Sequence, residues 1–163
     1  MPWDWPSARQ IDRPANELAQ GNEMPLPETI RYLEPSQSAG KLFVQRGIEG
    51  GLVMLNLLRF REVADYSANP ELAPAAPISG AEAFDRYIRH TLPFLRESGG
   101  DVAFLGAGGP FLIGPEDERW DMAMLVRQSS VTSFLARKPR GLSRRSRPSH
   151  GCARGRRLLP LTE

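Results

Sequence analysis

The sequence has a single cysteine, Cys152, among its 163 residues, so no disulfide can form within the chain. It also has no apolar stretch that approaches the ~20 residues of a membrane-spanning helix. Residues 1–6, Met-Pro-Trp-Asp-Trp-Pro, lack the basic start and the apolar centre of a secretory signal. A lone cysteine fits a reducing compartment. We therefore expect a cytoplasmic protein with no membrane partner.

Positive charge is scarce in most of the chain and concentrated near its end. Residues 1–136 hold 12 Lys and Arg against 18 Asp and Glu, whereas residues 137–163 hold nine against one. The net charge of +2 therefore describes neither part. All nine of these basic residues lie in the run 137–157, a pattern that suggests nucleic-acid binding. The run lacks aromatic residues that would stack on bases and any Cys and His spacing for zinc.

The clearest predicted element is a helix that begins with a capping box formed by Ser79 and Glu82. Apolar side chains then recur on one face at helical spacing, and Gly99 supplies the stop. Pro93 lies inside this helix and predicts a kink. Residues 51–60 precede it and are nearly all apolar. This run is too short for a good helix, so it predicts a strand buried on both faces.

Weaker patterns predict two more helices, two more strands and a last edge strand. They fall at residues 36–47, 129–135, 102–105, 120–127 and 158–161. The order predicts an α+β fold: a ferredoxin-like βαββαβ sheet with helices on one face, preceded by an extra N-terminal helix. The expected parts are an extended arm (1–34), the ferredoxin-like domain (35–136), an aberrant, disordered basic segment (137–157) and the last edge strand (158–163).

Several short motifs together resemble one known family. They are Val-Met-Leu-Asn-Leu-Leu-Arg-Phe at 53–60, Trp-Asp-Met-Ala-Met-Leu-Val-Arg at 120–127, Phe-Leu-Ala at 134–136, Tyr87 and Pro93. The set resembles domain-of-unknown-function family 1330, of the dimeric α/β-barrel superfamily. The resemblance implies that two protomers pair sheet to sheet as a homodimer. It also implies a pocket for a small organic ligand between sheet and helices, with cofactor-independent isomerase- or monooxygenase-like chemistry.

The basic run begins where this resemblance requires the second helix to continue, and family-like sequence resumes at Leu158. Its Arg, Pro, Gly, Ser and Ala residues correspond to GC-rich codons. Reading one nucleotide forward permits a sequence like the family's missing helix. We therefore interpret residues 137–157 as a frameshifted segment. A disordered basic tail and a nucleic-acid-binding arm are the alternatives, and nucleic acid is the least favoured partner.

Five residues are candidates for a site. Tyr87 and His90 border the apolar face of the long helix and are the candidate catalytic residues, because a histidine beside a tyrosine suits proton transfer near neutral pH. Asn56, the one polar residue in its strand, would hold a ligand carbonyl. Arg59 at the strand end would clamp a carboxylate, and Trp120 would line the pocket.

Each candidate also has an ordinary structural explanation, so a non-catalytic binding or assembly module is the alternative function. A buried asparagine is commonly satisfied by backbone, and an arginine at a strand end is commonly solvated. The glycine-rich residues 106–110 precede a strand-like sequence and not a helix N-terminus, so they predict no dinucleotide site. We expect neither a cofactor nor a metal.

Overall fold

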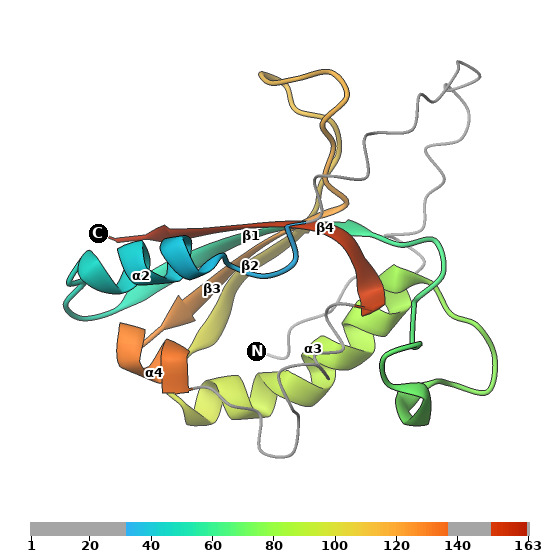
Figure 1. The fold of residues 1–163 in the computed structure, drawn as a ribbon, viewed down its shortest axis with the longest axis horizontal. Coiled ribbons are helices and arrows are strands. Elements are labelled where there is room, and N and C mark those ends of the chain that lie inside the picture. The colour runs from blue at the N-terminus through green and yellow to red at the C-terminus, as the bar shows by residue number, and fades with distance from the viewer. Residues whose placement is uncertain (1–31, 137–150, 163) are drawn as a thin grey trace.

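A four-stranded antiparallel sheet with helices packed on one face forms the fold (Figure 1). The computed structural model describes residues 32–136 and 151–162. The elements in order are α2 (Gln37–Gln45), β1 (Leu52–Phe60), a 3₁₀ turn (Pro70–Leu72), α3 (Gly80–Glu97), β2 (Asp101–Ala107), β3 (Met122–Gln128), α4 (Val131–Ala136) and β4 (Ala153–Leu161). The predicted α+β class, with a sheet and helices on one face, is confirmed.

The strands lie in the order β2-β3-β1-β4, so β1 and β3 form the centre of the sheet. Leu55 of β1 pairs with Leu125 on one side and with Leu159 on the other. This order agrees with the predicted ferredoxin-like pattern. Alternate residues of β1, from Leu52 to Phe60, are buried against the helices, and those between them are half-buried. The strand expected to be buried on both faces is therefore buried on one face in the single chain.

Helix α3 begins and ends where the sequence predicts. The Ser79 hydroxyl accepts a hydrogen bond from the backbone N–H of Glu82 at 3.1 Å and caps the first turn. Gly99 follows the helix with φ of +76°, a left-handed conformation that glycine adopts without strain. The helix continues through Pro93 to Glu97. Its apolar face, which includes Phe84, packs on the sheet and closes the core.

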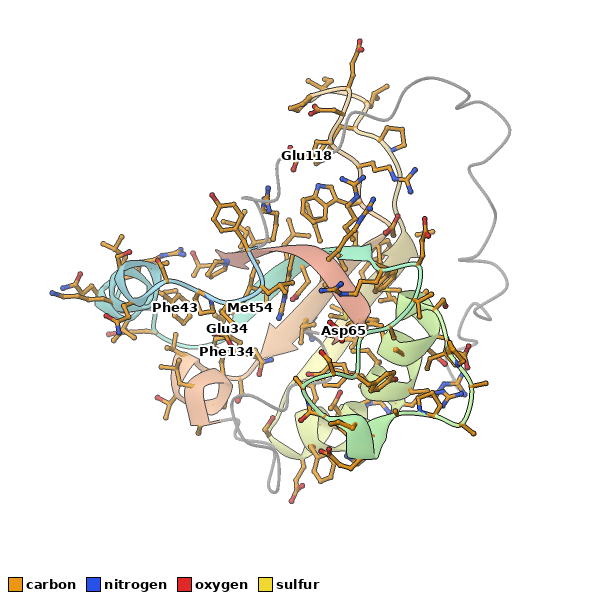
Figure 2. The ribbon with its side chains drawn as sticks, turned by 45° about the vertical axis from the view of Figure 1, so that its right-hand side comes forward. Glu34, Phe43, Met54, Asp65, Glu118 and Phe134 are labelled. Atoms are coloured by element: carbon orange, nitrogen blue, oxygen red, sulfur yellow. The ribbon has the colours of Figure 1, made fainter. Side chains whose placement is uncertain are left out.

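The two short helices lie on the same side of the sheet as α3. Phe43 of α2 meets Phe134 of α4 edge to face, with ring centroids 5.9 Å apart. Figure 2 shows both phenylalanines on this side, with Glu118 of the β2–β3 connection on the other. The second face of the sheet is not covered by any helix in the described part of the chain (Figure 1).

Strand β4 begins at Ala153, five residues before the boundary expected at residue 158. Cys152 and Ala153 are fully buried, and the Cys152 carbonyl accepts a hydrogen bond from the Arg61 N–H at 3.0 Å. The Gly151 carbonyl accepts another from the Asp65 N–H at 2.9 Å. The observed start of β4 differs from the expected one because no apolar pattern marks it. It is formed by small residues, which allow the close approach of another backbone.

The end of the basic run is thus part of the fold. Residues 153–157 belong to β4, where we expected a disordered segment. The frameshift and nucleic-acid interpretations concern residues 137–157, and 137–150 of these lie outside the described residues. The arm expected at 1–34 lies almost entirely outside them as well.

Candidate functional site

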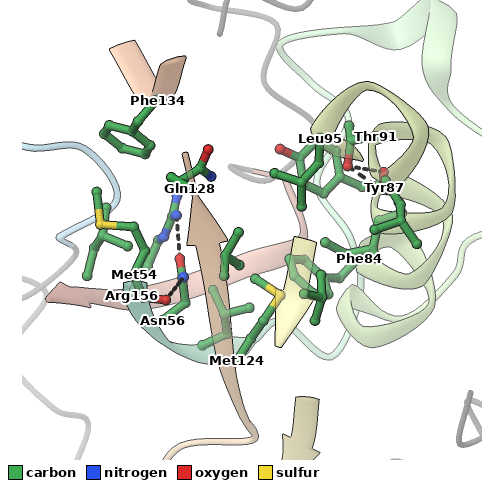
Figure 3. A pocket seen from close by; sticks show the side chains of 16 residues that line it. Met54, Asn56, Phe84, Tyr87, Thr91, Leu95, Met124, Gln128, Phe134 and Arg156 are labelled. Atoms are coloured by element: carbon green, nitrogen blue, oxygen red, sulfur yellow. Dashed lines mark hydrogen bonds between the residues drawn. The ribbon is translucent and has the colours of Figure 1, made fainter. Parts of the chain in front are cut away.

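A cavity of about 80 Å³ lies between the helix-facing side of the sheet and α3 (Figure 3). At about 30 Å³ for each water, the volume that a water molecule occupies in the liquid, it has room for roughly two to three water molecules. Apolar side chains from β1, β3 and α3 form most of its wall. The polar lining residues are Asn56, Tyr87, Thr91, Gln128 and Arg156. Apolar walls with a few convergent polar groups are typical of small-molecule sites.

Asn56 and Arg156 form a hydrogen-bonded pair at one wall of the cavity. Arg156 Nη2 donates to Asn56 Oδ1 at 2.7 Å, and Asn56 Nδ2 donates to the Met54 carbonyl at 3.0 Å (Figure 3). Asn56 is only 2% exposed. The two side chains share a face because β4 pairs antiparallel with β1, so Arg156 and Leu158 follow the same alternation as Leu58 and Asn56.

Gln128 contributes a second buried amide at the end of β3. The residue is 1% exposed, and its Oε1 has no hydrogen-bond partner among the described residues. A buried acceptor without a partner costs free energy unless water or a ligand supplies a donor. The Thr91 hydroxyl, by contrast, donates to the Tyr87 carbonyl at 2.9 Å. Gln128 is therefore the lining group that most clearly needs a partner from inside the cavity.

Of the two candidate catalytic residues, the structure brings only Tyr87 to the cavity. His90 is exposed, and its ring meets Phe94 with centroids 5.7 Å apart. At about 100° per residue, His90 lies on the far side of α3 from the buried Ile88. The structure thus does not place the two together at a site, because a residue at the border of a helical face can turn either way.

Arg59 and Trp120 also lie away from the cavity. Arg59 occupies the alternate face of β1 from Asn56. The Trp120 indole N–H donates to Glu118 Oε1 at 3.1 Å, and the Arg157 guanidinium lies over its ring, 5.0 Å from the centroid. Arg157 also lies 5.0 Å from the ring centroid of Tyr32. Trp120 therefore belongs to a cation–π stack and does not line the predicted pocket.

Neither Gln128 nor Arg156 was predicted as a site residue, although strand alternation indicates the direction of each side chain. Gln128 continues the alternation of Met122, Met124 and Val126 toward the helices. Arg156 lies two residues before Leu158 and so shares its face, but only once the strand is extended into the basic run.

The described part of the chain contains neither a cluster of metal-binding side chains nor a helix able to cross a membrane. Across residues 32–136 and 151–162, no three His, Cys, Asp or Glu side chains converge as a metal site requires. Within the same ranges, no helix combines the length and apolar character needed to cross a bilayer.

Comparison with solved structures identifies relatives of this fold. A crystal structure of methylated RPA0582 is 31% identical over 82% of this chain and 95% of its own length, with a TM-score of 0.64. The chain belongs to the RPA0582 family. A second structure of RPA0582, from Rhodopseudomonas palustris, is 30% identical over 80% of this chain and 95% of its own, with a TM-score of 0.62.

RPA0582 is itself a protein of unknown function, so membership of its family supports the fold and assigns no activity. No family model matches the chain, and no curated protein matches it. The specific assignment to domain-of-unknown-function family 1330, with its dimeric barrel, stays a prediction.

Proposed function

We propose that the protein binds a small organic molecule in the cavity between the sheet and α3. The observation that carries the proposal is the unpartnered Oε1 of Gln128, buried in the wall of an otherwise largely apolar cavity. A core that serves only to stabilise the fold is destabilised by such a group. Asn56 and Arg156 add two further polar side chains from neighbouring strands. Together they give the cavity groups that orient a ligand.

Any proton transfer in this cavity would fall to Tyr87, since His90 lies outside it. A tyrosine hydroxyl both donates and accepts hydrogen bonds. It would serve a cofactor-independent isomerase- or monooxygenase-like reaction as a proton donor. A non-catalytic binding protein would use the same hydroxyl to hold its ligand. Turnover therefore separates these two versions of the proposal.

A homodimer that pairs through the helix-free face of the sheet is the second part of the proposal. Leu55 of β1, Leu125 of β3 and Leu159 of β4 lie side by side on this face. The β2–β3 connection rises from the same side (Figure 1), and its residues Leu112 and Ile113 are 100% and 92% exposed. An apolar surface of this extent favours a second copy as its cover.

Ligand-observed NMR with a panel of small acids, amides and alcohols tests the binding proposal. We expect saturation transfer to some members of the panel with the wild-type chain. Val126→Phe places a ring in the cavity and should abolish that transfer. Val44→Phe is the matched control, because Val44 is exposed on α2 and does not line the cavity. Thermal unfolding of both variants verifies their folding.

Two outcomes would contradict the proposal. One is that no member of the panel binds the wild-type protein. The other is that a folded Val126→Phe variant binds the same ligands with unchanged affinity, which would locate them outside the cavity. If Val126→Phe does not fold, Val102→Phe fills the cavity from β2 and takes its place.

A further inference from the structure

One buried amide in the cavity wall indicates which class of ligand the cavity takes. We infer that the cavity binds a small carboxamide that pairs with the side chain of Gln128, an inference that rests on the proposed ligand cavity. Gln128 lines the cavity at the end of β3 and is 1% exposed. Its Oε1 has no hydrogen-bond partner among the described residues. A ligand that supplies a donor therefore relieves the cost of burying this oxygen.

The described groups beside Oε1 do not offer it a donor. A Cβ on Gly100 would lie 3.3 Å from Oε1 and still closer to a methyl group of Leu95, so both residues border this oxygen. The Leu95 side chain is apolar, and the Gly100 N–H already donates to the Leu95 carbonyl at 3.0 Å. The Thr91 hydroxyl is directed to the Tyr87 carbonyl at 2.9 Å. Where water fills this role in the free protein, a ligand displaces it without loss only by bringing a donor of its own.

A carboxamide complements the Gln128 amide better than other common donors do. Its N–H donates to Oε1 while its carbonyl accepts from an N–H of Nε2, so the two amides are joined by two hydrogen bonds. The last torsion of a glutamine side chain has a broad, two-fold preference, so the amide turns easily to present both atoms. An alkylammonium also donates, but no Asp or Glu among the 16 described lining residues would neutralise its charge (Figure 3). An alcohol has a single oxygen for both roles, so it meets only one of the two atoms with good geometry.

The size of the cavity limits the rest of the ligand. Its volume of about 80 Å³ is between two and three times the ~30 Å³ that a water molecule occupies in the liquid. The smallest amides are therefore suitable probes, with a methyl group that packs on apolar lining residues such as Val126 and Phe134. Acetamide and acetone form a matched pair, because they share their shape and their carbonyl. Acetone has a methyl group where acetamide has its N–H donors.

NMR titrations of the unaltered protein with acetamide and with acetone test the inference, with the Val126 methyl signals as reporters of the cavity. We expect acetamide to bind about tenfold or more tightly than acetone, because acetone leaves Oε1 without a donor. Gln128→Met nearly keeps the length of the side chain and removes its amide. It should weaken acetamide binding about tenfold, to the affinity of acetone. Gln45→Met is the matched control, since Gln45 is exposed at the end of α2 and does not line the cavity, and it should leave the difference intact.

The possible outcomes separate this inference from the proposed cavity. Equal affinities for acetamide and acetone in the wild-type protein would overturn the carboxamide inference and leave the cavity standing. So would a folded Gln128→Met variant that keeps the preference for acetamide, and so would binding of other panel members without binding of acetamide. If Gln128→Met does not fold, the comparison of the two probes on the wild-type protein decides alone. Failure of both probes and of every panel member to bind would overturn the inference and the ligand cavity together.

Discussion

Substitution of Gly151 by alanine tests whether the end of the basic run is packed into the domain. A Cβ at this position would lie well inside 3.0 Å of the Asp65 backbone oxygen, a separation that real Cβ atoms do not show. The Asp65 N–H donates to the Gly151 carbonyl at 2.9 Å, so the two backbones cannot separate without losing this bond. Arg61 and Cys152 are joined in the same way at 3.0 Å.

The expected destabilisation follows from these contacts. Overpacking against rigid backbone costs typically 1–3 kcal/mol, and loss of a backbone hydrogen bond adds about 1 kcal/mol. We expect a loss of about 3 kcal/mol in the free energy of unfolding. At roughly 2–4 °C per kcal/mol for a chain of this size, the Tm should fall by about 6–12 °C.

Urea unfolding and thermal unfolding measure this loss directly. Gly109→Ala is the matched control, because a Cβ at Gly109 meets nothing within 4 Å. It should change stability by less than about 1 kcal/mol. If Gly151→Ala unfolds like the control, residues 151–157 are not packed against the 61–65 segment. The position of Arg156 in the cavity wall would then fall as well, since β4 follows directly.

Two further predictions concern the buried thiol and the helix-free face. Burial raises the pKa of the Cys152 thiol to about 12, from an ordinary value of 9.0. The free energy that the protonated thiol contributes to folding is therefore complete below pH 9, where the thiol is protonated in both the folded and the unfolded chain. It is lost as the pH rises from about 9 toward 12, because the thiol of the unfolded chain ionises at a lower pH than the buried thiol. Cys152→Ala should lose less stability than wild type between pH 8 and 10.5 in urea unfolding; identical losses would contradict the buried thiol. Leu55→Asp should convert a dimer to monomer in sedimentation velocity by placing a charge on the helix-free face, whereas Val44→Asp on the exposed side of α2 should not. A monomeric wild-type protein at high concentration would refute the dimer.

The parts of the fold that could be predicted depend on local chemistry. The capping serine at residue 79, the helical spacing that follows and the glycine stop define α3 without reference to the rest of the chain. The apolar runs of β1 and β3 are similarly clear. The start of β4 could not be predicted, because Gly151, Cys152 and Ala153 form a strand entry only through contacts with the distant 61–65 segment.

The site was predicted less well because side-chain direction depends on pairing. Asn56 could be placed in the interior as the one polar residue of its strand. Arg156 faces the cavity only through the register between β4 and β1, which no local pattern gives. His90 lies on the far side of α3 from the buried Ile88, and the helical spacing alone had placed it at the border of the apolar face. The frameshift interpretation of residues 137–157 depends on codons, and the nucleotide sequence tests it.

The ligand cavity is tested most directly by a methionine-methyl NMR titration with a ligand that binds in the panel of small acids, amides and alcohols. Met54 and Met124 line the cavity. Met122 lies on the same strand as Met124 and is 2% exposed, like Met54, but does not line the cavity. This ligand should shift the Met54 and Met124 methyl signals saturably and leave the Met122 signal in place. Saturable binding that leaves Met54 and Met124 unmoved would contradict a ligand site between the sheet and α3.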